Sequence, residues 1–447
     1  MQVDIFSSDL IKKPAILPVF TELVMNGVID CLQERGLIDA IGGDNVHEVL
    51  NKPSKVYVGF DPTADSLHLG NFVGMMVLSW FQRFGHTPVI VLGGATGKIG
   101  DPSGKSTERP LLDEETLRRN TEGIRRNFLH ILDFSGNLSL PEIVNNDTWL
   151  SSFPLISFLR DVGKHFRMGP MLGKESVRAR IQSEEGMSFT EFSYQVLQAY
   201  DFYYLFQHQN VWIQMGGSDQ WGNITAGIEL IRKLTGKAAF GITFPLIVRS
   251  DGKKFGKSEE GAIWLAKEKL SPYLFYQYLM QIPDQDVIGL IKKLTFLPIS
   301  EIEMLASSMQ TASYLPNTAQ RRLAEEVTRL VHGNEGLAEA IRVTEGVGPG
   351  SLQSLTLETL KAIEGSMPHI VMKRSDVIAH SWIDVSVSSK FLASKGEASK
   401  LVQNDGAYLN QMRVEDGKRL IQENDLLGER YLVFGAGKKK KVLIIIE

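Results

Sequence analysis

The chain of 447 residues is poor in features that would each define a class of protein. Cys31 is the only cysteine, which excludes an intrachain disulfide and a cysteine-rich zinc site. No run approaches the roughly 20 uninterrupted apolar residues of a membrane span, so we expect no membrane partner. The formal net charge is only −4, so a nucleic-acid partner would need locally clustered positive charge.

The first residues lack the marks of a targeting segment. Residues 1–20 have no small-residue cleavage site and no enrichment in Arg and Ser, as expected of a cytoplasmic protein. A chain trimmed of a presequence would look the same and would belong in an organellar matrix. The length predicts about three domains.

Residues 57–71, YVGFDPTADSLHLGN, organise the rest of the chain. The apolar run ending at Phe60 predicts a buried strand, and the run 72–84 predicts the helix that follows it. The loop between them offers hydroxyls, an imidazole and a glycine at the start of a helix, where backbone N–H groups favour an anion such as phosphate. The alternative is an ordinary strand-to-helix connection with a capping Ser or Thr.

A second glycine-rich loop follows the next predicted strand, 88–92. Residues 93–109, GGATGKIGDPSGKSTER, are too rich in glycine for regular structure. Ligands of open α/β sheets bind outside the carboxyl ends of the strands, so this loop should face the same crevice. Lys105 and Arg109 could instead form a solvated surface pair.

A predicted helix carries three hydrogen-bonding side chains on one face. Tyr194, Gln198 and Asp201 follow an i, i+4, i+7 spacing. A charged Asp in so apolar a segment would be costly if buried without a partner. The pattern favours a pocket for a small amphipathic ligand over core tyrosines and an Asp at a helix end.

Two later segments add an acidic residue and a basic loop. Asp219 follows the apolar run 211–215, and an acidic residue at such a strand end commonly holds a ribose hydroxyl, although it also suits a simple turn. Residues 249–261, RSDGKKFGKSEEG, form a positively charged loop able to close on a polyphosphate. Such a loop is otherwise a solvated lysine-rich surface.

Together the four motifs resemble class I aminoacyl-tRNA synthetases over essentially the whole chain. YVGFDPTADSLHLGN and KFGKS are similar to the HIGH and KMSKS motifs, while GGATGKIGDPSGK and QMGGSDQWGN resemble the bacterial tyrosyl branch. The resemblance implies an α/β catalytic domain with a Rossmann-like, doubly wound parallel sheet, then an α-helical domain and a small α+β RNA-binding domain. It implies a tyrosine-tRNA ligase that uses L-tyrosine, ATP and tRNA(Tyr), with Mg²⁺ on the nucleotide and no protein-bound metal.

The family's site residues carry over position by position. By resemblance, tyrosine would be bound by Tyr57, Thr96, Asp101, Tyr194, Gln198, Asp201 and Gln220, with Tyr57 and Asp201 at the phenol. ATP and the adenylate would contact Gly59, Asp61, His68, Gly70, Asn71, Gln214, Gly217, Asp219 and Lys257. Charge on the reacting phosphates would be stabilised by Thr63, His68, Lys105, Arg109, Lys254 and Lys257. No general base is needed, because the tyrosine carboxylate is already ionised.

Some positions depart from the family pattern. Asn71 stands where the first motif ends in His, although asparagine can still donate a hydrogen bond. Phe255 and Gly256 replace Met and Ser of the second motif. Lys98 stands where an aliphatic residue is expected, which puts the packing of the 93–109 loop in doubt.

We expect four parts along the chain. They are a catalytic domain with a helical dimerisation insertion (1–246), the KFGKS loop with an α-helical anticodon-binding domain (247–344), a flexible linker (345–374) and an RNA-binding domain resembling the type named after ribosomal protein S four (375–447). From residue 371 onward the chain has 13 Lys and Arg against 10 Asp and Glu, so RNA phosphate should be met there. Lys438 to Lys441 could instead guard the last strand from aggregation. By resemblance the protein is a homodimer, with the interface around 150–200.

Three other functions are compatible with parts of this pattern. A tryptophanyl-tRNA synthetase shares the expected fold, but Asp201 and the terminal RNA-binding domain argue against it. An adenylyltransferase with only the first motif would be far shorter and would lack KFGKS. An RNA-binding protein on a dead scaffold conflicts with intact His68, Asp101 and Lys257, while an added splicing role stays open.

Overall fold

The computed structural model describes residues 27–104, 107, 109, 111–184, 186–248, 250, 255–258, 261–346, 360, 364, 367–437 and 440–447. Most of the predicted linker, and Lys105, Lys254, Lys438 and Lys439, lie outside the described residues. The chain forms two compact units, one of residues up to Ala266 with Pro283–Ala319, the other of Lys267–Ile282 with Gln320–Glu447.

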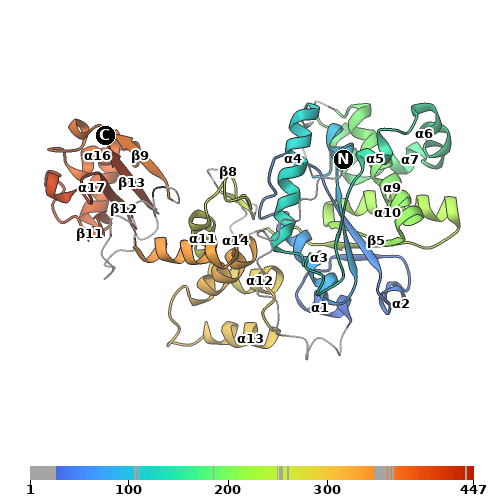
Figure 1. Ribbon diagram of the computed structural model, residues 1–447, viewed down its shortest axis with the longest axis horizontal. Helices are drawn as coiled ribbons and strands as arrows, with labels where there is room; N and C mark the ends of the chain where they lie inside the picture. The colour runs from blue at the N-terminus through green and yellow to red at the C-terminus, as the bar shows by residue number, and fades with distance from the viewer. Residues whose placement is uncertain are drawn as a thin grey trace. The chain divides into compact units, whose positions relative to one another are not determined.

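A six-stranded sheet forms the centre of the first unit (Figure 1). Its strands, in sheet order, are β1 (Ala40–Gly42), β6 (Phe240–Phe244), β5 (Val211–Gly217), β2 (Lys55–Phe60), β3 (Thr87–Leu92) and β4 (Glu142–Asn145). The strands from β6 to β4 are parallel, and β1 is an antiparallel edge. The chain extends the sheet from β2 through β3 to β4 and then returns to the other side of β2, so the order reverses between β2 and β5. The predicted Rossmann-like, doubly wound sheet is confirmed.

Alternation along β2 decides which side chains face which helices. Val56, Val58 and Phe60 share one face, and Tyr57 and Gly59 share the other. On the first face, α3 (Phe72–Arg83) packs so closely that a Cβ on Gly74 would lie 3.6 Å from Phe60. The second face is covered by α9 (Phe189–Gln209) and α10 (Trp221–Thr235), which also pack on each other.

A buried arginine ties the segment after residue 283 to this unit. Arg35 follows α1 (Val28–Glu34) and donates hydrogen bonds to the Lys292, Thr295 and Leu297 carbonyl oxygens at 2.7–3.2 Å. These carbonyls lie at the end of α12 (Asp284–Leu294), where the helix dipole favours a cation. The guanidinium also lies 4.2 Å from the centre of the Trp80 ring.

The other helices and strands of the first unit are short or peripheral. They are α2 (Val46–Leu50), α4 (Glu114–Asn127), α5 (Asp147–Leu150), α6 (Leu155–Asp161), α7 (Met168–Leu172), α8 (Glu175–Ile181), α13 (Ile299–Ser308), β7 (Lys257–Ser258) and β8 (Gly261–Ala262). No helix among the described residues is both long and apolar enough to cross a membrane.

The second unit combines helices with a five-stranded sheet. The helices are α11 (Pro272–Met280), α14 (Thr318–Gly346, kinked at Gly333), α16 (Trp382–Ser388) and α17 (Lys395–Gln403). The strands, in sheet order, are β11 (Met412–Arg413), β10 (Ala407–Leu409), β12 (Tyr431–Ala436), β13 (Lys440–Ile446) and β9 (His369–Met372).

Each face of this second sheet buries a different set of side chains. On one face Trp382 of α16 stacks on Phe434 with ring centres 5.8 Å apart. On the other, Val433 and Ile445 pack with Tyr273 of α11 and Val343 of α14. The predicted small α+β domain is confirmed, and it shares a core with α11 and α14.

Candidate active site

The carboxyl ends of β2 and β3 bring the first two motifs together. Asp61 follows β2, and a Cβ on Gly93 after β3 would lie 2.0 Å from Asp61 Oδ1, so only glycine allows this approach. Thr96 Oγ1 donates to Asp61 Oδ1 at 2.8 Å, and the Tyr194 hydroxyl of α9 donates to Asp61 Oδ2 at 2.9 Å. Burial raises the pKa of Asp61 to about 6.

Asp201 lies about two helical turns beyond Tyr194 on α9 and is held by two donors. Asn146 Nδ2 donates to Asp201 Oδ2 at 2.9 Å, and Trp149 Nε1 donates to Asp201 Oδ1 at 2.7 Å. Asn146 also donates to Thr96 Oγ1 at 2.9 Å, which joins Asp201 to the Asp61 cluster. Burial raises the pKa of Asp201 to about 7.

The Tyr57 hydroxyl is buried and has no hydrogen-bond partner among the described residues. The Tyr57 ring packs on Phe202, the residue after Asp201, with ring centres 5.5 Å apart. Its pKa is raised, first by burial and then by the Asp201 charge. Gln214 Oε1, from the residue that pairs with Tyr57 across the sheet, is also buried without a described partner. Because an unpaired buried polar atom costs free energy, these two atoms indicate a ligand that hydrogen-bonds.

A chain of amide side chains extends this polar surface across the start of α10. Gln220 Nε2 donates to Asp101 Oδ2 at 2.6 Å, and Gln220 Oε1 accepts from Gln198 Nε2 at 3.2 Å. Asn223 Nδ2 in turn donates to Gln198 Oε1 at 2.9 Å. The Asp101 carboxylate and the Gln198 and Gln220 amides therefore form one continuous hydrogen-bonded network.

The surface above the end of β2 is open. Gly59 is exposed although it lies on a central strand, and a Cβ there would meet nothing within 4 Å. Asp219 follows the end of β5, and Cβ atoms on Gly217 and Gly104 would come within 2.6 and 3.5 Å of its carboxylate. The strand order reverses between β2 and β5, and ligands of such sheets bind outside the strand ends at that point.

Backbone hydrogen bonds hold the KFGKS segment against the first motif. Leu69 N donates to the Ile263 oxygen at 2.7 Å, and Ile263 N donates to the Gly256 oxygen at 2.9 Å. Gly256 has φ of 79°, and a Cβ on it would lie 2.6 Å from the Gly70 nitrogen. Both features require glycine, which accounts for Gly256 in place of the Ser of the usual motif.

The remaining predicted residues surround this core. His68 Nδ1 accepts from Gly70 N at 3.1 Å, and Asn71 Oδ1 accepts from His68 N at 3.1 Å. Thr63 is exposed, and Arg109 Nε donates to the Asp101 carbonyl oxygen at 3.2 Å. Of Lys257, only the backbone, in β7, is described.

Lys98, whose effect on the loop was in doubt, has a defined partner. Its Nζ lies 3.0 Å from Asp147 Oδ1 at the start of α5 and 3.6 Å from Glu114. Hydrogen bonding to Asp147 raises the pKa of Lys98. The lysine therefore fits the loop by ion pairing instead of apolar packing.

Sequence reasoning missed Asn146, Trp149 and Asn223. Asn146 directly follows β4, so the rule that polar residues after parallel strands face the crevice could have found it. The strand EIVN is short and only partly buried, which hid the signal. Trp149 and Asn223 gave no such signal, because each is defined only by its contact with Asp201 or Gln198.

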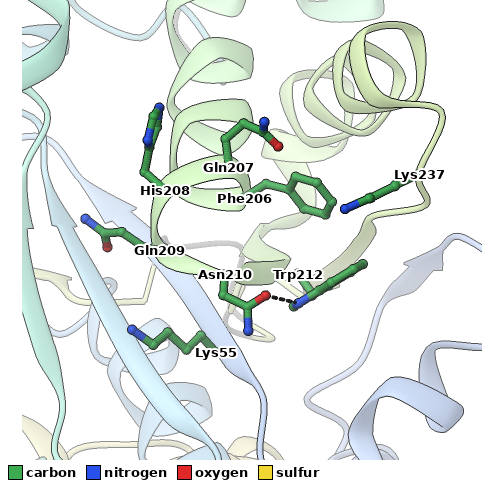
Figure 2. Close-up of a pocket in the computed structure, with 8 residues that line it drawn as sticks. All are labelled: Lys55, Phe206, Gln207, His208, Gln209, Asn210, Trp212 and Lys237. Carbon is green, nitrogen blue, oxygen red and sulfur yellow. Dashed lines mark hydrogen bonds between the residues drawn. The ribbon is translucent and has the colours of Figure 1, made fainter.

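A cavity lies at the opposite end of the sheet, at the amino ends of β2 and β5 (Figure 2). It measures about 420 Å³ and is lined by Lys55, Phe206, Gln207, His208, Gln209, Asn210, Trp212 and Lys237. Its polar side chains point in different directions, and Lys55 is paired with Glu142 at 2.6 Å. The cavity has no part in the network described above.

The sheet, its reversal point and the four motifs define a class I aminoacyl-tRNA synthetase. Consistent with this, the family model described as tRNA synthetases class I (W and Y) matches residues 49–347. A second model, the C-terminal domain of tyrosine-tRNA ligases of the SYY-like type, matches residues 359–444.

The relatives identify the branch. A tyrosine-tRNA ligase from Protochlamydia amoebophila is 54% identical over 94% of this chain and 99% of its own, and a chloroplastic/mitochondrial one from Arabidopsis thaliana is 49% identical over 94% and 83%. The solved C-terminally truncated mitochondrial tyrosyl-tRNA synthetase of Aspergillus nidulans is 32% identical, with a TM-score of 0.63 over 71% of this chain and 93% of that one. The chain belongs to the tyrosine-tRNA ligase family, and the sequence-based prediction of this enzyme is confirmed.

Proposed function

We propose that this site activates L-tyrosine with ATP and then transfers tyrosine to the 3'-terminal adenosine of tRNA(Tyr). The tyrosine carboxylate oxygen attacks the α-phosphorus, the bond to the β-phosphate oxygen breaks, and pyrophosphate leaves. A terminal ribose hydroxyl then attacks the adenylate carbonyl, and AMP leaves. The buried, unpaired Tyr57 hydroxyl beside Asp201 is the observation that best supports tyrosine as the substrate.

Tyrosine would enter with its phenol towards Tyr57 and Asp201. Its ammonium group suits the carboxylate of Asp101 and the polar groups of Tyr194 and Gln198, with Thr96 nearby, because opposite charge stabilises a partly buried ammonium. Gln220 would lie near the tyrosine carboxylate. Phenylalanine would leave the groups at the phenol unpaired and so would be rejected.

The opening between β2 and β5 would take the nucleotide. Asp219 would hold a ribose hydroxyl, with Gln214 and Gly217 beside it. Because Gly59 has no side chain, it would leave room for the adenylate. Thr63, His68 and the cations Lys105, Arg109, Lys254 and Lys257 would stabilise the charge that moves onto pyrophosphate. Within the described residues no group of His, Cys, Asp or Glu is arranged to hold a metal ion. Mg²⁺ would come with the ATP phosphates and supply further neutralising charge.

The first test is pyrophosphate exchange into ATP with each of the twenty amino acids, without tRNA. Exchange with tyrosine alone is expected. Exchange with tryptophan, or no exchange with any of the twenty amino acids, would refute the proposal. His68→Ala and Lys257→Ala should each slow adenylate formation greatly while tyrosine affinity stays nearly unchanged, since both would act on the transition state. An equal loss of tyrosine binding would show that these roles are misassigned.

An exposed apolar surface supports a homodimer. Its side chains come from α6 to the start of α9: Leu155, Ile156, Leu159, Met168, Leu172, Ile181 and Phe189. Ile156 and Phe189 are 74% and 77% exposed, and so many exposed apolar side chains in one stretch of the chain support an interaction surface there. Phe189→Asp should yield a monomer by light scattering, whereas Leu140→Asp, an exposed leucine outside this set, should not. A monomeric unmodified protein would refute the dimer.

The C-terminal domain would meet tRNA phosphate through its exposed lysines. Lys395 is paired with Asp384 at 2.6 Å, whereas Lys390 and Lys400 are exposed with no such pair among the described residues. Lys390→Glu with Lys400→Glu should raise the tRNA KM and leave tyrosine-dependent exchange intact, because phosphate contacts are electrostatic. Lys395→Met serves as the control with a smaller effect. An unchanged tRNA KM would exclude this face.

We also propose that the domain boundaries lie after residues 246, 344 and 374, as predicted. We further propose that the protein is cytoplasmic. The gap between the two matched family models, 347 to 359, falls within the predicted linker. The plant relative is named chloroplastic/mitochondrial, so microscopy of the tagged chain in its own cell is the decisive test of location.

A further inference from the structure

One lysine joins the segment between α7 and α8 to the start of α10. Lys174 Nζ donates a 2.5 Å hydrogen bond to the Gly222 carbonyl oxygen. The lysine stem lies over Gly222, where a Cβ would come within 3.2 Å of Lys174 Cδ. Lys174 is partly buried, and this burial lowers its pKa to about 8.

The residue at the start of α10 uses its side chain in the polar network and not as a helix cap. Gln220 is the N-cap residue, yet its side chain makes no capping hydrogen bond. Instead it donates to Asp101 and accepts from Gln198. Lys174 binds a carbonyl oxygen of this first turn, so it fixes the position of the turn without acting as its cap.

Lys174 itself projects from a firmly held support. At the far end of α8, Arg180 forms a 2.8 Å ion pair with Glu191 of α9, and both side chains are only 3% exposed. Met171 before the lysine and Val177 after it are buried in one apolar cluster with α9 and α10. The segment is thus fixed to α9, and Lys174 transmits that fixed position to α10.

We propose that Lys174 is a positioning residue of the amino-acid site. By holding Gly222 it sets the first turn of α10, and so fixes Gln220 and Asn223 in the network with Asp101 and Gln198. The inference rests on the proposed function, in which this network binds the ammonium and carboxylate groups of tyrosine. Lys174 touches neither substrate; it acts through the α10 backbone.

Pyrophosphate exchange on the full-length protein tests the proposal, with the KM values for tyrosine and ATP measured separately. Lys174→Met should raise the tyrosine KM about tenfold, the loss expected for one hydrogen bond to a charged group, and change the ATP KM less than about twofold. Lys174→Arg, which keeps the donor, should restore part of the loss. Lys233→Met is the matched control, since Lys233 donates at 2.8 Å from the other end of α10 to the His165 carbonyl.

A second variant protects the test from misfolding. Gly222→Ala keeps the lysine but crowds its stem, and it should raise the tyrosine KM in the same direction. An unchanged tyrosine KM in both variants, an equal rise in the ATP KM, or the same effect from Lys233→Met would overturn the positioning role. Absence of tyrosine-dependent exchange in the unmodified protein would instead refute the proposed function.

Discussion

Replacing Tyr57 by Phe should separate the stability of this protein from its selectivity. In the free protein the Tyr57 hydroxyl is buried, and no described group pairs with it. A buried polar group without a partner costs about 1–3 kcal/mol, so its removal should raise the free energy of unfolding by about 1 kcal/mol. Few single changes stabilise a protein, which makes the sign of this effect informative.

The same change should weaken the choice of tyrosine over phenylalanine. Without the Tyr57 hydroxyl, bound tyrosine would lose one hydrogen bond to its phenol, worth about 1 kcal/mol. Bound phenylalanine makes no such bond, so its binding would be unchanged. The ratio of kcat/KM for tyrosine to that for phenylalanine should fall about fivefold to tenfold. Asp201 remains in Tyr57→Phe, so most of the discrimination should persist.

The assay pairs urea unfolding with pyrophosphate exchange on both amino acids. Tyr273→Phe removes a hydroxyl from the other compact unit and should leave the selectivity ratio unchanged. A less stable Tyr57→Phe protein would mean that the hydroxyl is paired in the free state. An unchanged ratio would mean that it never contacts the phenol.

Three further predictions concern Asp201, Gly256 and Arg35. Burial raises the pKa of Asp201 to about 7 from its ordinary value of 3.8, so between about pH 4 and 7 the native state binds a proton that the unfolded chain lacks. The free energy of unfolding should therefore fall as pH rises through this window, more steeply in the unmodified protein than in Asp201→Asn; equal slopes by urea unfolding would contradict the assignment. Gly256→Ala should lower the kcat of exchange with little change in tyrosine affinity by equilibrium dialysis, because its Cβ would collide with the Gly70 nitrogen; an unaffected kcat would show that this contact is dispensable. Arg35→Met should cost about 3 kcal/mol in urea unfolding, as a buried cation with three carbonyl partners is lost, while kcat per folded molecule stays constant; a loss below about 1 kcal/mol would argue against the clamp.

Local patterns were sufficient for the elements that carry the site. The apolar runs before Asp61 and Asp219 predicted the strands β2 and β5, and the spacing of Tyr194, Gln198 and Asp201 predicted one face of α9. These inferences succeed because the repeat of a strand or helix fixes where each side chain points. The resemblance of the four motifs then gave the family, which the relatives confirm.

Contacts between distant segments were beyond the reach of such patterns. The assignment of Pro283–Ala319 to the same compact unit as the first sheet depends on packing such as that of Arg35 against the end of α12, more than 250 positions away in the chain. Likewise, the partners of Asp201 come from residues about 50 positions earlier, and Lys98 is accommodated by Asp147 across the fold.

The sequence by itself determined the strands and loops that carry the four motifs, the chemical groups that follow those strands, and the family. It did so because periodicity, glycine placement and charge are local properties that survive in the unfolded chain. Only the tertiary structure decided which polar groups find partners. The Tyr57 hydroxyl has no partner in the part of the chain that the structure describes, whereas Asp201 is held by Asn146 and Trp149, and Gly222 by Lys174. Hydrogen bonding in a buried site depends on distances that only folding creates.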